Sequence, residues 1–303
     1  VQFMDNGQEI DLDHVRQIIT TRPKTILKQN AKMQKSGVNF NTRLPALKGL
    51  AVDEETGEFI FVDTCPGAGA CQSLCYAKGG FYVVFKGVWE GMSQLLNFLI
   101  NDPAGFEAKL SEEIEAQRKI YEPQGVTVNV RWHDAGDFFS DEYMQMAVRI
   151  ANKFPTVKFY AYTKMGKVAT AKLPNNFDTN WSEGATSDQR KVIRIHQDQT
   201  KQRIKHSEIV PRDLFRGMLD RVQDPTSTNP KDKVWAWKAG QEAAFKQKLA
   251  AKYNLDPKSI LSYDQMDKIA PSQVPKYNVY IVPGEPDTSA NRRDVIGTYL
   301  LQH

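Results

Sequence analysis

The chain contains 303 residues, of which 41% are hydrophobic and 25% are charged, and its formal net charge is +4. These values are ordinary for a soluble globular protein, and the length fits one barrel-sized α/β domain or two smaller domains. A net charge this small does not by itself require a nucleic-acid partner, and no apolar run reaches the roughly 18 residues of a membrane-spanning helix. The first residues include acids and lack the apolar segment of a signal peptide, so we expect a cytoplasmic protein with no membrane partner.

In chain order, the sequence first predicts an arm, a hairpin and two helices. Residues 1–45 are polar and basic, and we expect them to form an N-terminal arm. Two apolar runs separated by an acidic turn with a glycine predict a β-hairpin over residues 48–63. After a loop that holds all the cysteines, helical patterns cover residues 84–101 and 103–121, and the second begins with a proline in its first turn.

The three cysteines of the chain, Cys65, Cys71 and Cys75, lie within eleven residues of one another in a glycine-rich loop. A disulfide would explain only two of them, and a reducing cytoplasm favours thiolate ligands over disulfides. Three thiolates are one fewer than the usual four ligands of zinc or of an iron–sulfur cluster, which leaves a position open to a substrate, a cofactor, a water or a distant residue. The spacing therefore predicts a metal centre. The alternatives are a disulfide with one odd thiol, or three buried cysteines.

The second half of the chain repeats a strand, a polar loop and a helix. Strands are predicted at residues 126–132, 157–163, 177–182 and 277–282. This rhythm is typical of parallel β/α units, whose ligands gather at the carboxyl ends of the strands. We therefore predict an α/β fold, a β/α barrel that is complete or incomplete, with its core in residues 46–188 and 266–303.

Polar side chains crowd the loop that follows the strand at 126–132. Its sequence is His-Asp-Ala-Gly-Asp from His133 to Asp137. Either Asp134 or Asp137 could bind an amine, a ribose hydroxyl or a metal, and Gly136 would let a ligand approach the backbone. The alternative is a simple helix N-cap, made by Asp137 or Ser140. A cap explains one residue and leaves the His-Asp pair without a role, so we predict that His133, Asp134 and Asp137 are catalytic.

The next strand ends in Thr163 and Lys164, which we predict to contact a cofactor together with Gly136 and Asp137. Loops at the carboxyl ends of parallel strands share one face of a barrel. We therefore expect at least one of the catalytic candidates to lie within a ligand's length of the cysteine sulfurs.

Residues 189–252 carry fifteen Lys or Arg against seven Asp or Glu, and we expect residues 189–265 to form a basic helical insertion. One interpretation is a solvated helical segment. The other is a surface for phosphate backbones, with tryptophans that stack on bases. The residues predicted to contact nucleic acid are Lys231, Lys233, Trp235, Trp237 and Lys238.

Three sequences together carry a resemblance to a known family. They are Cys-Pro-Gly-Ala with the two later cysteines, His-Asp-Ala-Gly-Asp-Phe-Phe-Ser, and Phe-Tyr-Ala-Tyr-Thr-Lys. In this combination the chain resembles the phage gene product 88 family, over roughly residues 25–185 and the C-terminal strand region. The resemblance implies a phage protein acting in the host cytoplasm, and it implies little about activity.

The layout is also similar to that of a radical SAM enzyme. That superfamily places three cysteines after the first barrel strand, often followed by an aromatic residue, here Tyr76. The resemblance implies that Cys65, Cys71 and Cys75 hold a [4Fe–4S] cluster whose open iron binds S-adenosylmethionine, with Gly136 and Asp137 near its amino group. The spacing here, C-x5-C-x3-C, departs from the common CxxxCxxC. With the basic segment, this layout suggests an enzyme that modifies a base in DNA, or a nucleotide.

Two other functions stay open at this point. One is a zinc-containing 7-deazaguanine DNA transglycosylase, similar to tRNA-guanine transglycosylases, with Asp134 or Asp137 as the nucleophile. Its zinc cysteines would be expected late in the chain, whereas these come early. The other is a zinc-stabilised DNA-binding module, which leaves the loop from His133 to Asp137 without a role.

Overall fold

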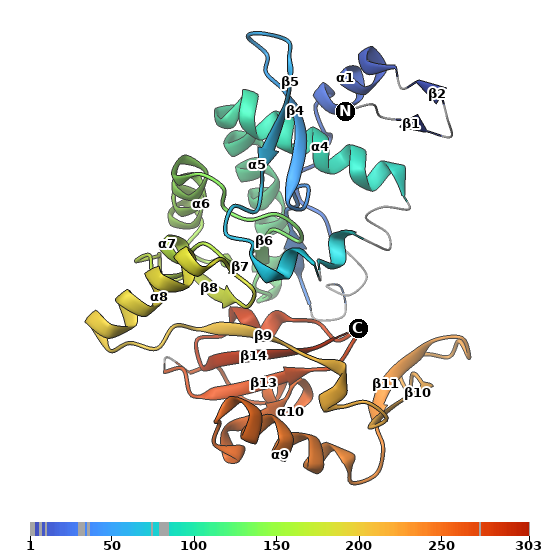
Figure 1. The fold of residues 1–303 in the computed structure, drawn as a ribbon, viewed down its shortest axis with the longest axis vertical. Coiled ribbons are helices and arrows are strands. Elements are labelled where there is room, and N and C mark those ends of the chain that lie inside the picture. The colour runs from blue at the N-terminus through green and yellow to red at the C-terminus, as the bar shows by residue number, and fades with distance from the viewer. Residues whose placement is uncertain are drawn as a thin grey trace.

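The computed structural model describes residues 4–5, 8–9, 11–29, 34, 37–73, 75–78, 85–272 and 274–302. Within these ranges no helix is both long and apolar enough to span a membrane. The largest element is a sheet of eight strands, accompanied by three two-stranded sheets (Figure 1).

All eight strands of the central sheet run parallel, in the order β12-β13-β14-β9-β8-β7-β6-β3. Their bounds are β3 (Asn39–Asn41), β6 (Asn129–Trp132), β7 (Lys158–Thr163), β8 (Phe177–Ser182), β9 (His206–Val210), β12 (Ile260–Ser262), β13 (Tyr277–Ile281) and β14 (Val295–Leu301). Two neighbouring parallel strands must be joined by a crossover that brings the chain back to the end of the sheet where the first strand began. Helices supply most of these crossovers. The prediction of a parallel α/β core is confirmed.

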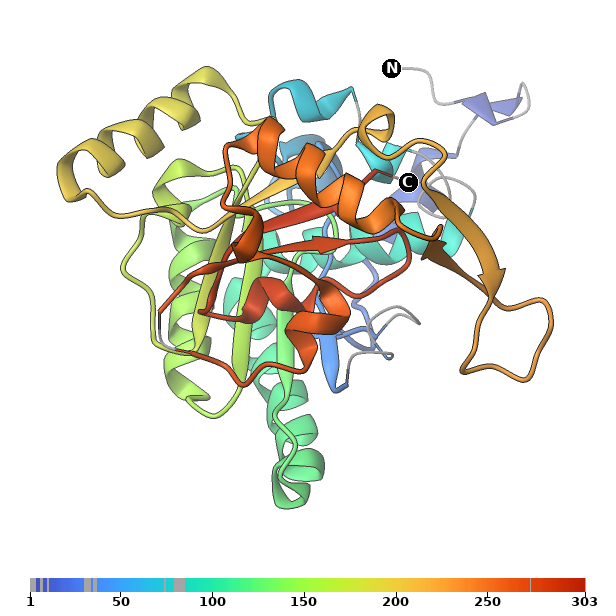
Figure 2. The ribbon, with the colours of Figure 1, turned by 90° about the horizontal axis from the view of Figure 1, so that it is seen from below.

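The strand order reverses once. From β3 to β9 each strand lies beside the previous one in the sheet, after which the chain crosses to the far edge and returns through β12, β13 and β14. The last strand therefore lies between β9 and β13, and β12 and β3 stand at opposite ends of the order. In Figure 2 the C-terminal strands (red) cross the direction of the central strands (green), so the sheet twists strongly.

The helices of the described chain begin at a side-chain cap in four of eight cases. They are α1 (Leu12–Thr20), α4 (Lys86–Asn101), α5 (Pro103–Tyr121), α6 (Asp141–Lys153), α7 (Gly166–Ala169), α8 (Ser187–Thr200), α9 (Gln241–Tyr253) and α10 (Tyr263–Asp267). At the start of α5 the Asp102 carboxylate accepts a hydrogen bond from Gly105 N at 2.9 Å. Ser140 caps α6 by accepting from Tyr143 N at 3.1 Å, so this part of the N-cap interpretation is correct.

Helices α4, α5 and α6 cover one face of β6, β7 and β8 and form the larger apolar core. The buried side chains of the strands that take part are Val130, Trp132, Phe159, Ala161 and Phe177. On the same face, α9 packs Phe245 and Leu249 against β9, β13 and β14 in a second cluster. Both apolar clusters thus lie on one face of the sheet, which also carries the polar side chains of His206 and Glu208 in β9.

Three hairpins of the described chain stand outside the central sheet. The predicted hairpin is present as β4 (Lys48–Val52) paired with β5 (Phe59–Asp63), and Asn97 of α4 holds it by accepting from Val52 N at 2.8 Å. The others are β1 (Met4–Asp5) with β2 (Gln8–Glu9), and β10 (Leu219–Gln223) with β11 (Lys233–Trp237).

Two segments differ from their predictions. Residues 189–265 were expected to be helical, yet they supply β9 and β12 to the central sheet and also the β10–β11 hairpin. Their strands are short and carry polar residues, such as His206 and Glu208 in β9, so alternation alone does not reveal them. Residues 1–45 include β3, which pairs with β6 at an edge of the sheet.

Candidate functional site

The cysteine loop docks on the carboxyl end of β8 through its backbone. Gly69 N donates to Gly184 O at 2.9 Å, and Thr186 N donates to Gly67 O at 3.0 Å. Ala68 and Ala185 form a β-bridge between these two contacts. These contacts fix the loop at the carboxyl ends of the strands, where ligands bind in parallel sheets.

The docking leaves no room for side chains at two glycines. A Cβ atom on Gly67 would lie 2.4 Å from Lys164 O at the end of β7. Gly184 has a φ of +80°, and a Cβ atom there would lie 2.8 Å from the Cβ of Cys71. These glycines were missed as site residues in the sequence. The glycines inside the cysteine loop are a signal for close packing, whereas nothing in the pattern around Gly184 marks it.

Asp137 joins the cysteine loop to the ends of two strands. Its backbone N donates to Thr64 O at 2.8 Å. One carboxylate oxygen accepts from Phe138 N at 2.7 Å and from the Thr163 hydroxyl at 2.8 Å, and the other accepts from Lys164 N at 2.7 Å. Burial raises the pKa of Asp137, and these hydrogen bonds oppose that shift. With both oxygens engaged, Asp137 is a positioning residue.

The pKa values of Cys65 and Cys71 depend on burial and on the charges of neighbouring groups. Burial raises the pKa of Cys65 to about 11, against a hydrogen bond that Leu47 N donates to its sulfur at 3.3 Å. Burial also raises the pKa of Cys71. For both thiols the charges of Cys75 and Asp137 add to the rise, so the four groups lie in one region. The expected proximity of a catalytic candidate to the cysteines thus holds for Asp137.

Lys164 places a positive charge beside this group. Its charge lowers the pKa of Cys71, although burial outweighs it. Its ammonium donates to the Ser182 hydroxyl at 3.0 Å, across the ends of β7 and β8. Thr163 and Lys164 therefore do lie beside the cysteine loop, as the sequence predicts.

All three cysteines are free thiols, and each is partly exposed. As the side chains are placed, no group of three or more Cys, His, Asp or Glu among the described residues could hold a metal ion. The side chain of Tyr76 and all of Leu74 lie outside the described residues.

His133 does not join the cysteines. Its ring is buried, with Nε2 at 2.8 Å from the hydroxyl of Tyr143 and its centroid 4.5 Å from that of Phe138. Burial lowers the pKa of His133 to about 3, so the imidazole is neutral at physiological pH. The prediction that it is catalytic is not supported by this position, because the side chain belongs to the aromatic core.

Asp134 lies on yet another side of the same loop. Its carboxylate is 4.0 Å from the guanidinium of Arg131, on the face of the sheet opposite to His133. The loop separates its three polar residues because His133 has a φ of +63° and Gly136 a φ of +89°. A Cβ atom on Gly136 would lie 2.7 Å from that of Leu44, so this glycine serves packing and not the approach of a ligand.

The predicted nucleic-acid residues lie on and beside β11. Trp237 stacks on Phe245 with ring centroids 4.8 Å apart, and Trp235 lies under Arg221. Both tryptophans pack against the second apolar cluster, which leaves little of either ring for bases. Lys238 is paired with Asp220 at 3.5 Å, and the remaining two, Lys231 and Lys233, are exposed.

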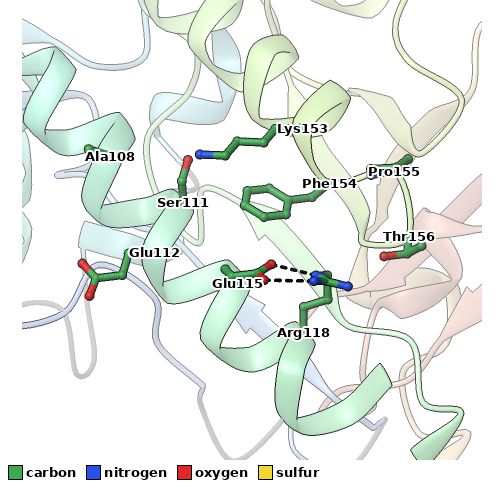
Figure 3. Close-up of a pocket in the computed structure, with 9 residues that line it drawn as sticks. All are labelled: Ala108, Ser111, Glu112, Glu115, Arg118, Lys153, Phe154, Pro155 and Thr156. Carbon is green, nitrogen blue, oxygen red and sulfur yellow. Dashed lines mark hydrogen bonds and ion pairs between the residues drawn. The ribbon is translucent and has the colours of Figure 1, made fainter. Parts of the chain in front are cut away.

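A hollow of about 650 Å³ lies between α5 and the end of α6 (Figure 3). Its lining residues are Ala108, Ser111, Glu112, Glu115, Arg118, Lys153, Phe154, Pro155 and Thr156. Glu115 and Arg118, neighbours on α5, form an ion pair on its wall at 2.7 Å. It opens at the amino end of β7, away from the strand ends where ligands gather, so we place the functional site at the cysteine loop instead.

Comparison with family models gives a match over most of the chain. A model described as Gene product 88 matches residues 24–252, which include the cysteine loop and the loop from His133 to Asp137. No curated protein and no solved structure matches.

We expect Gly184→Ala to loosen the cysteine loop without altering a cysteine. The added methyl group meets the Cβ of Cys71 and also strains a positive φ, at a cost of roughly 1–3 kcal/mol. Alkylation of Cys71 by iodoacetamide, followed by mass spectrometry, should become several-fold faster. Gly217→Ala is the matched control, since its φ is +76° and no described atom lies within 4 Å of the added methyl. Equal alkylation of Cys71 in the two variants would contradict this docking.

We expect the reactivity of Cys65 to keep rising at high pH. The thiolate is the reactive form, and burial places the pKa of Cys65 at about 11. In chelator-treated protein its alkylation rate should still increase about tenfold from pH 9 to pH 10, where a small thiol with a pKa of about 8.5 levels off. Unfolding in urea should restore the ordinary profile. A plateau below pH 9 in the folded protein would show that the thiol is not buried as described.

Proposed function

The chain belongs to the phage gene product 88 family, and on this premise we propose that it is a metal-dependent enzyme that modifies a nucleic-acid base. The observation that carries the proposal is the docking of the cysteine loop at the carboxyl ends of β7 and β8. This docking gathers three thiols, Asp137 and Lys164 in one region of the sheet edge.

The thiols fit a metal in their chemistry. Metals bind the thiolate form, which the Leu47 N–H favours at Cys65 and the Lys164 charge favours at Cys71. Metal binding would require the loop to bring its sulfurs closer together. The binding free energy of a thiolate site, about 10–16 kcal/mol for zinc in finger peptides, is large enough for such a rearrangement.

We favour a [4Fe–4S] cluster with S-adenosylmethionine over zinc, because the order of the motifs is similar to that of radical SAM enzymes. The cysteine loop falls between β3 and β6, the first two strands of the central sheet along the chain, and Gly136 and Asp137 follow β6. In this interpretation the sheet acts as an incomplete β/α barrel with its loops at one mouth. When bound, the cluster would supply the electron for reductive cleavage of S-adenosylmethionine.

The residues of the chain have separate tasks in this proposal. Asp137 holds the cysteine loop against the end of β7, and Thr163 fixes the orientation of its carboxylate. Lys164, which reaches across to Ser182, places a positive charge beside Cys71. That charge would stabilise thiolates and attract an anionic group of a substrate or cofactor.

One observation favours the zinc transglycosylase as the second candidate. Asp134 is partly exposed, with a side chain 22% accessible, whereas Asp137 is buried and fully engaged. If the reaction is base exchange, Asp134 is the better nucleophile. Asp134→Ala would then abolish exchange while nucleic acid still binds.

Exposed cations on α8 support a nucleic-acid substrate better than the β10–β11 hairpin does. Helix α8 projects from the body just after the point where the cysteine loop docks (Figure 1). It and the segment after it, residues 187–204, carry five Lys or Arg against two acids. Residues 219–238 of the hairpin carry four against three, so they are nearly neutral.

The metal content tests the proposal directly. Protein purified without oxygen should be brown and contain iron with acid-labile sulfide. Cys71→Ala should lose the whole metal, since two thiolates make a poor site. Ser73→Ala, an exposed change in the same loop, is the matched control and should retain it. Zinc without iron would favour the transglycosylase or a zinc-stabilised DNA-binding module, and protein without bound metal would overturn the proposal.

The charge distribution predicts how nucleic acid binds. Lys191→Glu combined with Arg194→Glu on α8 should weaken binding to all sequences and lower the salt dependence, by about 0.7–0.9 in log–log slope for each phosphate that is no longer neutralised. Fluorescence anisotropy over a range of salt concentrations measures both effects. Lys231→Glu with Lys233→Glu on the hairpin is the control and should change binding less. Absent or salt-independent binding to DNA and RNA would leave a small molecule as the substrate.

A further inference from the structure

The face of the central sheet opposite to the two larger apolar clusters is mostly polar from β3 to β9, whereas Val279 and Ile281 of β13 pack with Met266 of α10 in a third apolar cluster. Strand register places its side chains in rows across the strands, because paired residues point to the same side. We call this surface the inner face and define it by Asn41, Arg131, Tyr160, Tyr162, Asn180, Ser182, Ser207 and Thr298.

A short segment before β14 covers part of the inner face through polar contacts. Asp287 forms an ion pair with Arg131 at 2.7 Å, and its carbonyl accepts from the Tyr162 hydroxyl at 3.3 Å. Ala290 O accepts from Asn180 Nδ2 at 2.8 Å, within the helical turn η6 (Thr288–Asn291). This segment supplies partners to Arg131, Tyr162 and Asn180. Other buried polar atoms of the inner face have no hydrogen-bond partner among the described residues.

Five buried side chains of the inner face keep an oxygen without a hydrogen-bond partner among the described residues. These oxygens are Asn41 Oδ1, Tyr160 OH, Asn180 Oδ1, Ser207 Oγ and Thr298 Oγ1. None of the five residues is more than 3% exposed. A buried polar atom without a partner is costly, so a group of them on one surface of a native protein calls for a partner that the described residues do not supply.

All five unpaired oxygens can accept a hydrogen bond. Asn180 Nδ2 donates to Ala290 O, and Asn41 Nδ2 donates to Thr42 O at 3.4 Å, so the amide orientation leaves the carbonyl oxygens available in both residues. Tyr160, Ser207 and Thr298 add hydroxyls that can accept or donate. A ligand that suits this set supplies several hydrogen-bond donors.

Charges at the more exposed end of the inner face restrict the chemical class of the ligand further. Arg131 and Asp134 are partly exposed there, with side chains 14% and 22% accessible. Burial raises the pKa of Tyr160 most, the charges of Asp287 and Asp134 raise it further, and the charge of Arg131 lowers it. Two carboxylates against one guanidinium disfavour a phosphate and favour neutral hydroxyls.

We propose that the inner face binds the neighbouring hydroxyls of a sugar, with Tyr160, Asn180, Ser207 and Thr298 as hydrogen-bonding partners. Naming a nucleoside as the source of that sugar rests on the proposed function, and a free monosaccharide is the other source of the same chemistry. In the nucleoside case the substrate of the enzyme is a ribonucleoside or its unit in RNA, because DNA lacks the neighbouring hydroxyl pair.

Calorimetric titration of the full chain with three probes tests the proposal. Uridine should bind, and 2′,3′-dideoxyuridine should bind at least about tenfold more weakly because it lacks both ribose hydroxyls. D-ribose that binds as well as uridine would support the hydroxyl site and identify a monosaccharide as its ligand. Equal affinity for the two nucleosides, or no binding of any probe, would overturn the proposal.

Variants locate the binding on the inner face. Tyr160→Phe and Thr298→Val each remove an oxygen that has no partner among the described residues, so both should fold with unchanged stability and bind uridine about tenfold more weakly. Tyr253→Phe on α9 lies on the other face and is the matched control for removal of a hydroxyl. Unchanged affinity in Tyr160→Phe and Thr298→Val, with thermal melting that shows both are folded, would overturn the assignment.

The inner face needs none of the cysteines, which separates this inference from the proposed function. A variant with all three cysteines changed to Ser should lose metal and still bind uridine with the affinity of the unchanged protein. Protein that binds uridine but no metal would overturn the proposed function alone. Protein that contains metal but binds no probe would overturn this inference alone.

Discussion

The carboxylate of Asp137 is the constraint on which the candidate site depends. It is buried and accepts three hydrogen bonds from the loop after β6 and the end of β7, while the backbone of the same residue holds Thr64 at the start of the cysteine loop. A buried carboxylate is stable only when it is well satisfied. The cysteines, Lys164 and the loop after β6 therefore keep their relative positions as one unit. Backbone contacts at Gly67 and Gly184 then fix the second side of the loop.

The two faces of the central sheet carry side chains of different chemical character. Side chains alternate along each strand, so Trp132 and Phe159 enter the apolar core while Arg131 and Tyr160 point to the inner face. Loops at the strand ends can break this alternation. Two residues with positive φ in the loop after β6 send three polar neighbours in three directions, to the core, to the inner face and to the cysteines. A compact motif in sequence thus serves three separate environments.

The sequence predicts those helices and strands in which the spacing of apolar residues is regular. The strands at β6, β7, β8 and β13, the first hairpin, and helices α4 and α5 follow from alternation, turn residues and a proline start. Strand β9 carries polar residues and β12 has only three residues, and their pairing is imposed by neighbours far away in the chain. The proximity of Asp137 and Lys164 to the cysteines could be predicted from parallel topology. The burial of His133 and the packing of Trp237 could not, because both depend on tertiary contacts with Tyr143 and Phe245.

The reversal of strand order has a consequence for how the molecule is assembled. Strand β14 lies between β9 and β13 and, among the described strands, links the part of the sheet running from β3 to β9 with the part formed by β12 and β13. During synthesis the first part can pair strand by strand as it emerges, since each strand lies beside its predecessor. The second part can join it only when residues 295–301 insert between two edges that must both stay open until then. Exposed edges of this kind invite pairing with other chains, so the nascent protein is most exposed to aggregation late in its synthesis.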